Sequence, residues 1–411
     1  MEDMTTTPVA TAGPGLLRLM AVATGLSAAS LYVAYPILDL LRDRFGMSDT
    51  TAGLLVTVAQ AGYAAGLLLL VPMSDVVRRR PLALTLLTLT AAALVVAGAA
   101  QTGAVLLVAS ALAAVTAVGA QVIVPYAAEL AGPREQAHAV GVVMSGVILG
   151  GLLSRFLSGV LTDAFGWRTP YFVLAAALLA AAAGLARTMP RHDPDRPGLT
   201  VERYRGLLAS MIALVRAFPA LRLRSVLAAL SLASFVVQGA AVTFLLAGPR
   251  FGWTPTAIGT IGLLGAVGAL SGPVIGRIVD RGHGALLTTV GLIAQPVAWC
   301  AMLLADGAGG LSALIVGLVL LGIGQQAVLN TSQAVLYALV PEARGRINAV
   351  FMGTFFIGGT LGSAATAALW PVAGWTGCCL LGVGLATTAL VLYLAFRAVE
   401  RPGPDGAAPS A

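Results

Sequence analysis

Two charged residues inside apolar stretches, Arg155 and Asp39, are the strongest candidates for chemistry in this sequence. Arg155 lies in the apolar run 137–162, about 12 Å from its outer end, where a guanidinium costs several kcal/mol unless it faces a cavity or a partner. We therefore expect its side chain to face inward. It would act as the counter-charge of an anionic substrate or in proton coupling, with a fixed structural ion pair as the alternative.

Asp39 lies near the outer end of the run 17–41, where a carboxylate is partly hydrated, so an interfacial role is the default interpretation. The long side chain of Arg155, about one to two turns deeper, could approach it. We hypothesise an Asp39–Arg155 pair that opens on protonation or on substrate binding, which would make Asp39 a proton-coupling residue.

Glu129 follows Pro125 by four residues and Gln121 by eight, so the three side chains share one face of a helix. Gln121 is expected to reach a central cavity. Glu129 lies at the cytoplasmic end of its run, where the favoured interpretation is a loop anchor near Arg134 and the alternative is a proton carrier.

A polar stripe marks the run 309–339, because Gln326, Asn330 and Gln333 follow one another at i, i+4 and i+7. The stripe predicts either an aqueous cavity or interhelical hydrogen bonds, which are worth about 0.6 kcal/mol each. Other amide and aromatic side chains could line the same cavity, although aromatic residues in such helices more often belong to the core. They are Tyr32, Tyr35, Gln60, Gln238, Phe351 and Phe355. Such a pocket suits a moderately apolar organic molecule better than a sugar.

Other kinds of chemistry find no support in the sequence. Cys300, Cys378 and Cys379 have no metal-ligand spacing, and no phosphate-binding loop or pairing of residues suited to catalysis occurs. We therefore expect no enzyme activity, no cofactor and no metal. The net charge of +7 comes from Arg residues dispersed among loops, which predicts contact with anionic lipid rather than with nucleic acid.

The elements that must position these residues are membrane-spanning helices. Hydrophobic residues make up 58% of the chain and charged residues 10%, which is too apolar for a protein surface that faces water. Twelve apolar runs are each long enough to cross a bilayer as a helix. The runs are 17–41, 48–74, 81–100, 103–131, 137–162, 168–187, 224–249, 254–279, 284–305, 309–339, 346–370 and 373–396.

The basic residues predict the orientation of these spans. All 24 are Arg, and placing the N-terminus inside assigns nineteen to the cytoplasm, four to the outside and Arg155 to a span. Both termini are thus predicted to be cytoplasmic. The acidic N-terminus lacks a secretory signal, so the first run is retained. The absence of Lys and the Ala- and Gly-rich spans suggest a multi-pass protein of a bacterial cell (inner) membrane.

The second half of the chain repeats landmarks of the first at an offset of 206 to 208 residues, as Phe45-Gly46 returns at Phe251-Gly252 and Gly166-Trp167 at Gly374-Trp375. The repeat predicts two pseudo-symmetric six-helix bundles. Between them, Pro residues and eight Arg from Arg187 to Arg224 mark a linker with an amphipathic surface helix. The predicted parts are a disordered tail at 1–14, bundles at 15–188 and 224–399, a cytoplasmic linker at 189–223 and a second disordered tail at 400–411.

Two loop motifs resemble those of the major facilitator superfamily, whose members carry G-x-x-x-D-R-x-G-R-R after span two and a weaker copy after span eight. The second copy here is Gly276, Asp280, Arg281 and Gly284, and the first keeps Asp75, Arg79 and Arg80. The resemblance covers the whole chain and implies that Asp75 holds the halves together on the cytoplasmic side, with both Arg residues bracing it. A cluster that only anchors the loop is the alternative.

Within that superfamily the chain looks like the drug-efflux-like, twelve-span branch, although Val147 replaces the proline of the span-five antiporter motif and Val115 the arginine of span four. The predicted function is secondary transport of a small organic molecule by alternating access. The first interpretation is proton-coupled efflux, as in multidrug antiporters, and the alternative is uptake or facilitated diffusion of a nutrient or organic anion. The expected partners are substrate, protons and lipid, and the protein is expected to be a monomer.

Overall fold

The computed structural model describes residues 13–132, 135–190, 196–306, 310–340 and 343–397, and all regular elements within these ranges are helices. The first half contains α1 (Pro14–Ala29), η1 (Tyr35–Ile37), α2 (Leu38–Phe45), α3 (Asp49–Leu69), η2 (Val71–Asp75), α4 (Arg79–Gly98), α5 (Gly103–Thr116), α6 (Gly119–Ala131), α7 (Gln136–Phe165) and α8 (Thr169–Thr188). The second half follows the linker helix α9 (Val201–Ala217). It contains α10 (Pro219–Ala247), α11 (Pro255–Gly262), α12 (Gly265–Leu270), α13 (Gly272–Ile278), η3 (Val279–His283), α14 (Gly284–Leu303), η4 (Leu304–Asp306), α15 (Gly310–Leu339) and α16 (Arg344–Phe396).

The predicted twelve-span, two-bundle, all-α fold is confirmed, but several spans are not single helices. Nine helices of the described ranges are long and apolar enough to cross a membrane. The run 17–41 is divided among α1, η1 and α2, and the run 254–279 among α11, α12 and α13. Conversely, the last two runs share α16, which turns back at Gly374 (φ 54°, ψ −148°), a backbone conformation that glycine adopts readily.

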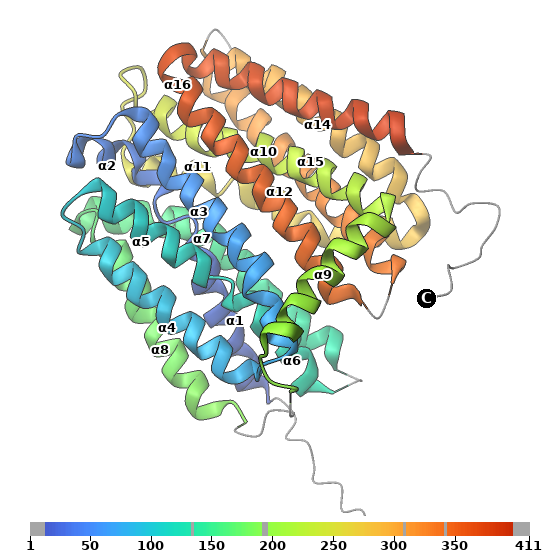
Figure 1. Ribbon diagram of the computed structural model, residues 1–411. Helices are drawn as coiled ribbons and strands as arrows, with labels where there is room; N and C mark the ends of the chain where they lie inside the picture. Colours follow the sequence, from blue (N-terminus) through green and yellow to red (C-terminus); the bar gives the residue numbers. More distant parts are fainter. Residues whose placement is uncertain (1–12, 133–134, 191–195, 307–309, 341–342, 398–411) are drawn as a thin grey trace, which may run out of the picture.

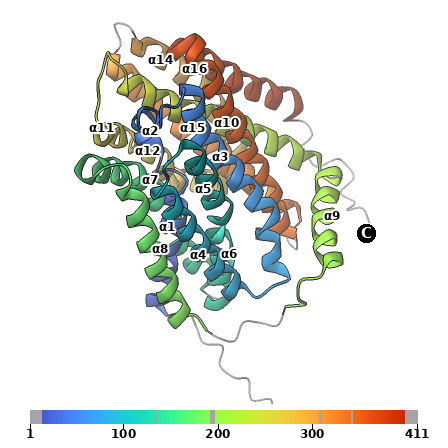
Figure 2. The ribbon, with the colours of Figure 1, turned by 60° about the vertical axis from the view of Figure 1, so that its left-hand side comes forward.

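The two halves lie side by side, with α3 and α16 at their junction (Figures 1 and 2). A Cβ atom at Gly53 would lie 2.7 Å from the Cβ of Ala367, so these helices approach closely. The Ser363 hydroxyl bonds the Thr57 hydroxyl at 3.0 Å across the same junction. The junction is thus tightly packed, with small residues allowing the backbones to meet.

The linker predicted for 189–223 contains α9, which lies outside the bundles at one end of the molecule (Figures 1 and 2). Two hydrogen bonds hold the linker to the first half. The Tyr204 hydroxyl of α9 donates to the Leu69 carbonyl at 2.9 Å, and the Gly198 amide, just before α9, donates to the Val76 carbonyl at 3.0 Å. Most of the predicted tails, residues 1–12 and 400–411, lie outside the described residues.

We name the two ends of the molecule by their charge. The Arg-rich end carries Arg78, Arg79, Arg80 and α9, whereas the Arg-poor end carries α2 and the start of α11. One residue departs from the predicted distribution, because Arg224 is not in a cytoplasmic loop. Its side chain is 1% exposed within the second half, where the guanidinium donates to the Thr288 hydroxyl at 3.0 Å and lies over the Tyr393 ring.

Candidate functional site

Glycines place α7 directly against α1, and α7 carries Arg155. A Cβ atom at Gly146 would lie 1.9 Å from the carbonyl oxygen of Ala21, and one at Gly150 would lie 2.0 Å from that of Gly25. Any side chain at Gly146 or Gly150 would therefore force the helices apart. The register of α7 along span one is fixed by these contacts.

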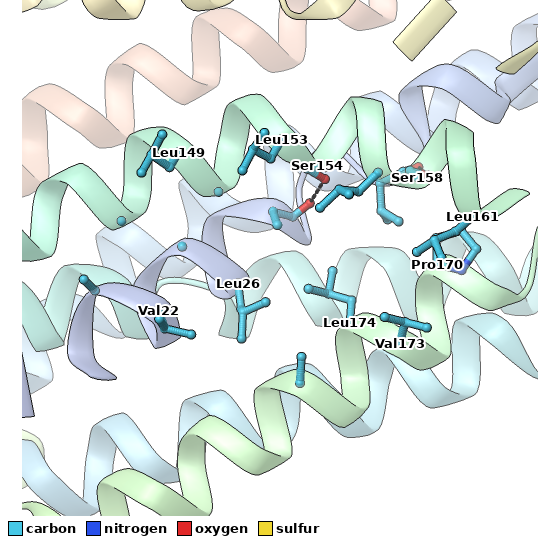
Figure 3. A pocket seen from close by; sticks show the side chains of 18 of the residues that line it. Val22, Leu26, Leu149, Leu153, Ser154, Ser158, Leu161, Pro170, Val173 and Leu174 are labelled. Atoms are coloured by element: carbon cyan, nitrogen blue, oxygen red, sulfur yellow. Dashed lines mark hydrogen bonds between the residues drawn. The ribbon is translucent and has the colours of Figure 1, made fainter. Parts of the chain in front are cut away.

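Span one is broken where α7 passes it. Residues 30–34 form turns between α1 and η1, so some backbone carbonyls there lack helical partners. Ser158 of α7 supplies one such partner, because its hydroxyl donates to the Val33 carbonyl at 2.6 Å. The Ser154 hydroxyl adds a second donor to the Ala29 carbonyl at 2.7 Å, which also accepts the Tyr32 amide at 3.0 Å (Figure 3). Irregular backbone is tolerated at membrane depth when it is satisfied inside the protein in this way.

Arg155 lies against two aromatic rings that this break presents. Its Cζ atom is 4.4 Å from the ring centroid of Tyr35 and 5.3 Å from that of Tyr32. The two tyrosine rings lie 5.7 Å apart, so the guanidinium and both rings form one compact group. A cation over an aromatic face gains about 0.5–2 kcal/mol, the upper value when it is shielded from water.

The Arg155 side chain also reaches the second half of the molecule. A Cβ atom at Gly239 of α10 would lie 3.5 Å from one of its terminal nitrogens, and one at Gly262 of α11 would lie 3.0 Å from its Cδ atom. Span eight is interrupted directly after Gly262, at residues 263–264. The guanidinium therefore lies between the halves, where broken spans of both halves meet, the usual location of a transport site.

Gln60 extends this group towards α16. Its Nε2 donates to the Tyr35 hydroxyl at 3.2 Å, and its side chain is 3% exposed. A Cβ atom at Gly359 would lie 3.2 Å from the Oε1 atom of Gln60, which has no hydrogen-bond partner. The structure thus brings together four of the predicted site residues, Tyr32, Tyr35, Gln60 and Arg155.

No carboxylate balances this cation in the described part of the chain. The ion pairs there join other Arg residues to acids, and Arg155, which is half-buried, is in none of them. A partly desolvated guanidinium beside two tyrosines can accept a negatively charged group of a ligand with little competition.

Asp39 does not form the hypothesised pair with Arg155. Its carboxylate lies 2.7 Å from Arg42, three residues further along α2, and Arg42 also pairs with Asp43 and Asp49. The short spacing lets Arg42 reach Asp39 within one helical turn, whereas Arg155 turns towards the tyrosines. Asp39 lines a hollow of about 610 Å³ between the halves at the Arg-poor end.

The other predicted cavity residues form separate groups rather than one pocket with Arg155. Asn330 receives a hydrogen bond from Gln326 at 2.8 Å and donates to the Gly272 carbonyl at 3.3 Å, so this part of the stripe joins span ten to span eight. Gln333 contacts Met352 instead.

Aromatic residues form another group. Gln121 donates to the Tyr63 hydroxyl at 3.4 Å, and the Tyr63 ring lies 4.5 Å from that of Phe356 across the junction of the halves. Phe355 packs between Phe351 and Phe356, and Gln238 is buried in α10. Tyr63 and Phe356, which sequence reasoning did not select, are therefore where Gln121 meets the other half.

The first loop motif forms ion pairs at the Arg-rich end. Arg79 lies 2.8 Å from Glu129 but 4.0 Å from Asp75, and Arg196 of the linker also binds Glu129 at 3.0 Å. Arg80 donates to the Ala186 carbonyl at 2.7 Å. Glu129 thus anchors the linker and the loop after span two, whereas Arg134, the neighbour expected from the sequence, lies outside the described residues.

The second copy of the motif lies on an irregular turn. Gly276 lies within α13, and Asp280 and Arg281 lie in η3. In η3, Gly282 has a φ of 86° and no residue is buried. Gly284 begins α14. This exposed turn places the repeated Asp at the same end of the molecule as Asp75.

An apolar groove of about 360 Å³ lies apart from these polar groups, between α1, α7 and α8 (Figure 3). Leu149, Leu153 and Val173 line it, and its lining contains no charged residue. The hydroxyl groups of Ser154 and Ser158 are directed to backbone carbonyls, so the groove suits hydrocarbon rather than a polar substrate.

Comparisons with known proteins agree with this architecture. The family model described as Major Facilitator Superfamily matches residues 20–308. The chain is 38% identical over 380 residues to the uncharacterized transporter YgaY of Escherichia coli O157:H7, covering 92% of this chain and 95% of that protein. It is 32% identical over 370 residues to the "Probable transporter SCO4007" of Streptomyces coelicolor, covering 88% of this chain and 83% of that protein.

Among solved structures, the chain resembles a bacterial homologue of the human lysosomal transporter Spinster. The TM-score is 0.76, and the match covers 97% of this chain and 100% of that one. The sequence identity is 16%, so this likeness concerns the fold alone.

Proposed function

Because the chain belongs to the major facilitator superfamily, we propose that it moves a small, negatively charged organic molecule by alternating access, with Arg155 as the counter-charge. The observation that carries this proposal is the position of the guanidinium between the two halves, over Tyr32 and Tyr35 and apart from the ion pairs of the described chain. A neutral substrate would leave this charge unbalanced within the membrane.

The surroundings of Arg155 narrow the substrate class. Two tyrosine rings and the Gln60 amide offer aromatic faces and a few hydrogen bonds, which suit an aromatic or moderately apolar carboxylate better than a sugar acid rich in hydroxyl groups. Contacts from both halves let a bound anion favour the conformations in which the halves close around it.

Export coupled to protons is the direction we propose. The Arg-rich end then faces the cytoplasm, with both termini, in the inner membrane of a bacterium. Asp39, which lines the hollow at the opposite end, is the carboxylate we assign to proton coupling. Uptake or facilitated diffusion of an organic anion is the alternative. Everted vesicles distinguish the two, because export predicts that they accumulate the compound when their interior is acidified.

Binding to the purified protein tests the role of Arg155. The probes are aromatic carboxylates such as salicylate and their amides, and the measurement is the shift in thermal unfolding midpoint as ligand concentration rises. We expect the carboxylates, but not the amides, to stabilise the protein, and we expect Arg155→Gln to weaken carboxylate binding about 100-fold. Arg155→Lys should retain part of the affinity, because the charge remains but the planar fork is lost.

Arg205→Gln is the matched control, because Arg205 is exposed on α9. Its midpoint shifts should equal those of the unmodified protein. Equal stabilisation by carboxylates and amides, or unchanged carboxylate binding in Arg155→Gln, would contradict the proposed anion site.

A further inference from the structure

A carboxylate of the first half binds the start of a helix of the second half at the Arg-poor end. The Oδ2 atom of Asp163, in the last turn of α7, accepts a hydrogen bond from the backbone amide of Thr256 at 2.8 Å, across 93 residues of sequence. Thr256 is the second residue of α11, and the Thr254 hydroxyl accepts the amide of the next residue. Asp163 therefore satisfies an amide that the first helical turn leaves free, and its charge suits the positive end of the helix dipole.

The same interface continues inwards as direct backbone contact. A Cβ atom at Gly159 would lie 2.4 Å from the carbonyl oxygen of Pro255, and one at Gly259 would lie 2.5 Å from that of Arg155. Asp163 lies eight residues from Arg155 along α7, about 12 Å. The contact that Asp163 completes thus reaches from the Arg-poor surface to the proposed anion site.

Span eight leaves α7 beyond this region. A Cβ atom at Gly268 would lie 2.5 Å from the backbone of Gly322 in α15, and one at Gly272 would lie 3.5 Å from Gln326 of the same helix. The glycines of span eight therefore face the first half only near the Arg-poor end. The two halves meet through α7 and α11 at that end and separate along these helices towards the other.

We propose that Asp163 is a latch of the transport cycle, which holds the halves together at the Arg-poor end and must release before that end can open. The repeat does not build a second one, because the position 208 residues further on is Pro371, which has no carboxylate. The latch is thus confined to the α7–α11 side of the Arg-poor end. The inference rests on alternating access and not on the charge of the substrate.

Distance measurement between spin labels tests the latch without any substrate. Labels on Gln101→Cys and Leu304→Cys report the separation of the halves, since both residues are exposed at the Arg-poor end and distant in sequence from the latch. Cys300 is replaced by Ser, whereas Cys378 and Cys379 are buried and can stay. In lipid nanodiscs, we expect Asp163→Ala to raise the population with long distances about five-fold, the size of a lost helix cap.

Two further variants separate a latch from a local cap. Asp163→Asn keeps an acceptor oxygen but loses the charge. Its long-distance population should therefore lie between those of the unmodified protein and of Asp163→Ala. Asp49→Asn removes a carboxylate from the same end whose ion partner, Arg42, is in its own half, and should leave the distances unchanged. If Asp163→Ala leaves the distances unchanged, even where hydrogen exchange at 255–262 rises, Asp163 only caps α11 and the proposal is overturned. An equal shift in Asp49→Asn would also overturn it.

Discussion

One carboxylate at each end shows how the ends differ. At the Arg-poor end, Asp163 crosses from one half to the other to reach Thr256. At the Arg-rich end, Asp75 approaches Arg79 of its own half, at 4.0 Å, and its side chain is 46% exposed. A carboxylate near a helix end can serve either purpose, and the distance to the facing half decides which one it serves in this conformation.

At the Arg-rich end, the ion pairs of Glu129 connect the first half to the linker. Glu129 binds both Arg79 and Arg196, and the linker makes two further hydrogen bonds to the first half. The linker start can therefore move with the first half as a unit. Comparison of the two ends teaches that a carboxylate links the halves at the Arg-poor end. At the Arg-rich end, Glu129 braces the first half and the linker, and the halves meet there through apolar contact such as that of Leu68 with Gly353.

Substitution of the glycine at the α7–α11 contact should break this comparison most strongly. Gly159→Ala introduces a methyl group less than 3.0 Å from backbone atoms of α11, which must then move away. Such overpacking costs about 1–3 kcal/mol, so we expect the open population at the Arg-poor end to rise about 10- to 100-fold, measured by the Gln101–Leu304 distance.

Gly141→Ala on the same helix is the control, because a Cβ atom at Gly141 meets nothing within 4 Å. Alanine in an exposed helical position adds about 1 kcal/mol of helix stability, so this variant should fold and keep the original distances. If Gly141→Ala and Gly159→Ala change the Gln101–Leu304 distance equally, the backbone contact between α7 and α11 does not hold the Arg-poor end closed.

Removal of Glu129 should have a smaller effect, and on stability rather than on the position of the halves. Glu129→Ala leaves Arg79, whose side chain is 13% exposed, without its closest charged partner. Partly buried, hydrogen-bonded ion pairs contribute about 1–2 kcal/mol, so the thermal unfolding midpoint should fall while the Gln101–Leu304 distance stays. Glu202→Ala on exposed α9 is the control. A changed distance in Glu129→Ala would mean that the Arg-rich end also couples the halves.

The sequence predicts the twelve crossings because each needs only about 20 apolar residues, which is a local property. It does not predict the break in span one, since the run 17–41 contains no proline before Pro36. At the break, the Ser154 and Ser158 hydroxyls bond the carbonyls of Ala29 and Val33 from a helix more than 100 residues away, which no local pattern reveals. In the sequence, the one local sign that these two serines act together is their i, i+4 spacing, which places them on one face of the helix that carries Arg155.

The candidate site was predictable in its members but not in its grouping. A lone arginine in an apolar run marks Arg155 by composition alone, whereas its contacts with Tyr32 and Tyr35 depend on the register that Gly146 and Gly150 impose. Asp39 was matched to a distant partner although Arg42 lies three residues away. The role of Asp163 is not predictable, because nothing near it in the sequence reveals an amide on the other half.

Substitution of Asp75 should have the smallest effect in the conformation described here and gives the finest test of the comparison. Its exposed contact with Arg79 contributes at most about 0.5 kcal/mol, so Asp75→Asn should leave the unfolding midpoint almost unchanged.

If Asp75 instead acts when the Arg-rich end closes, as the loop motif implies, its loss disfavours the conformation that is open at the Arg-poor end. The long-distance population between labels on Gln101 and Leu304 should then fall about two-fold, opposite in sign to the change in Asp163→Ala. In the double variant the two changes should partly cancel, because both act on one equilibrium between the same two conformations. A shift in the same direction for both single variants would contradict opposed latches at the two ends.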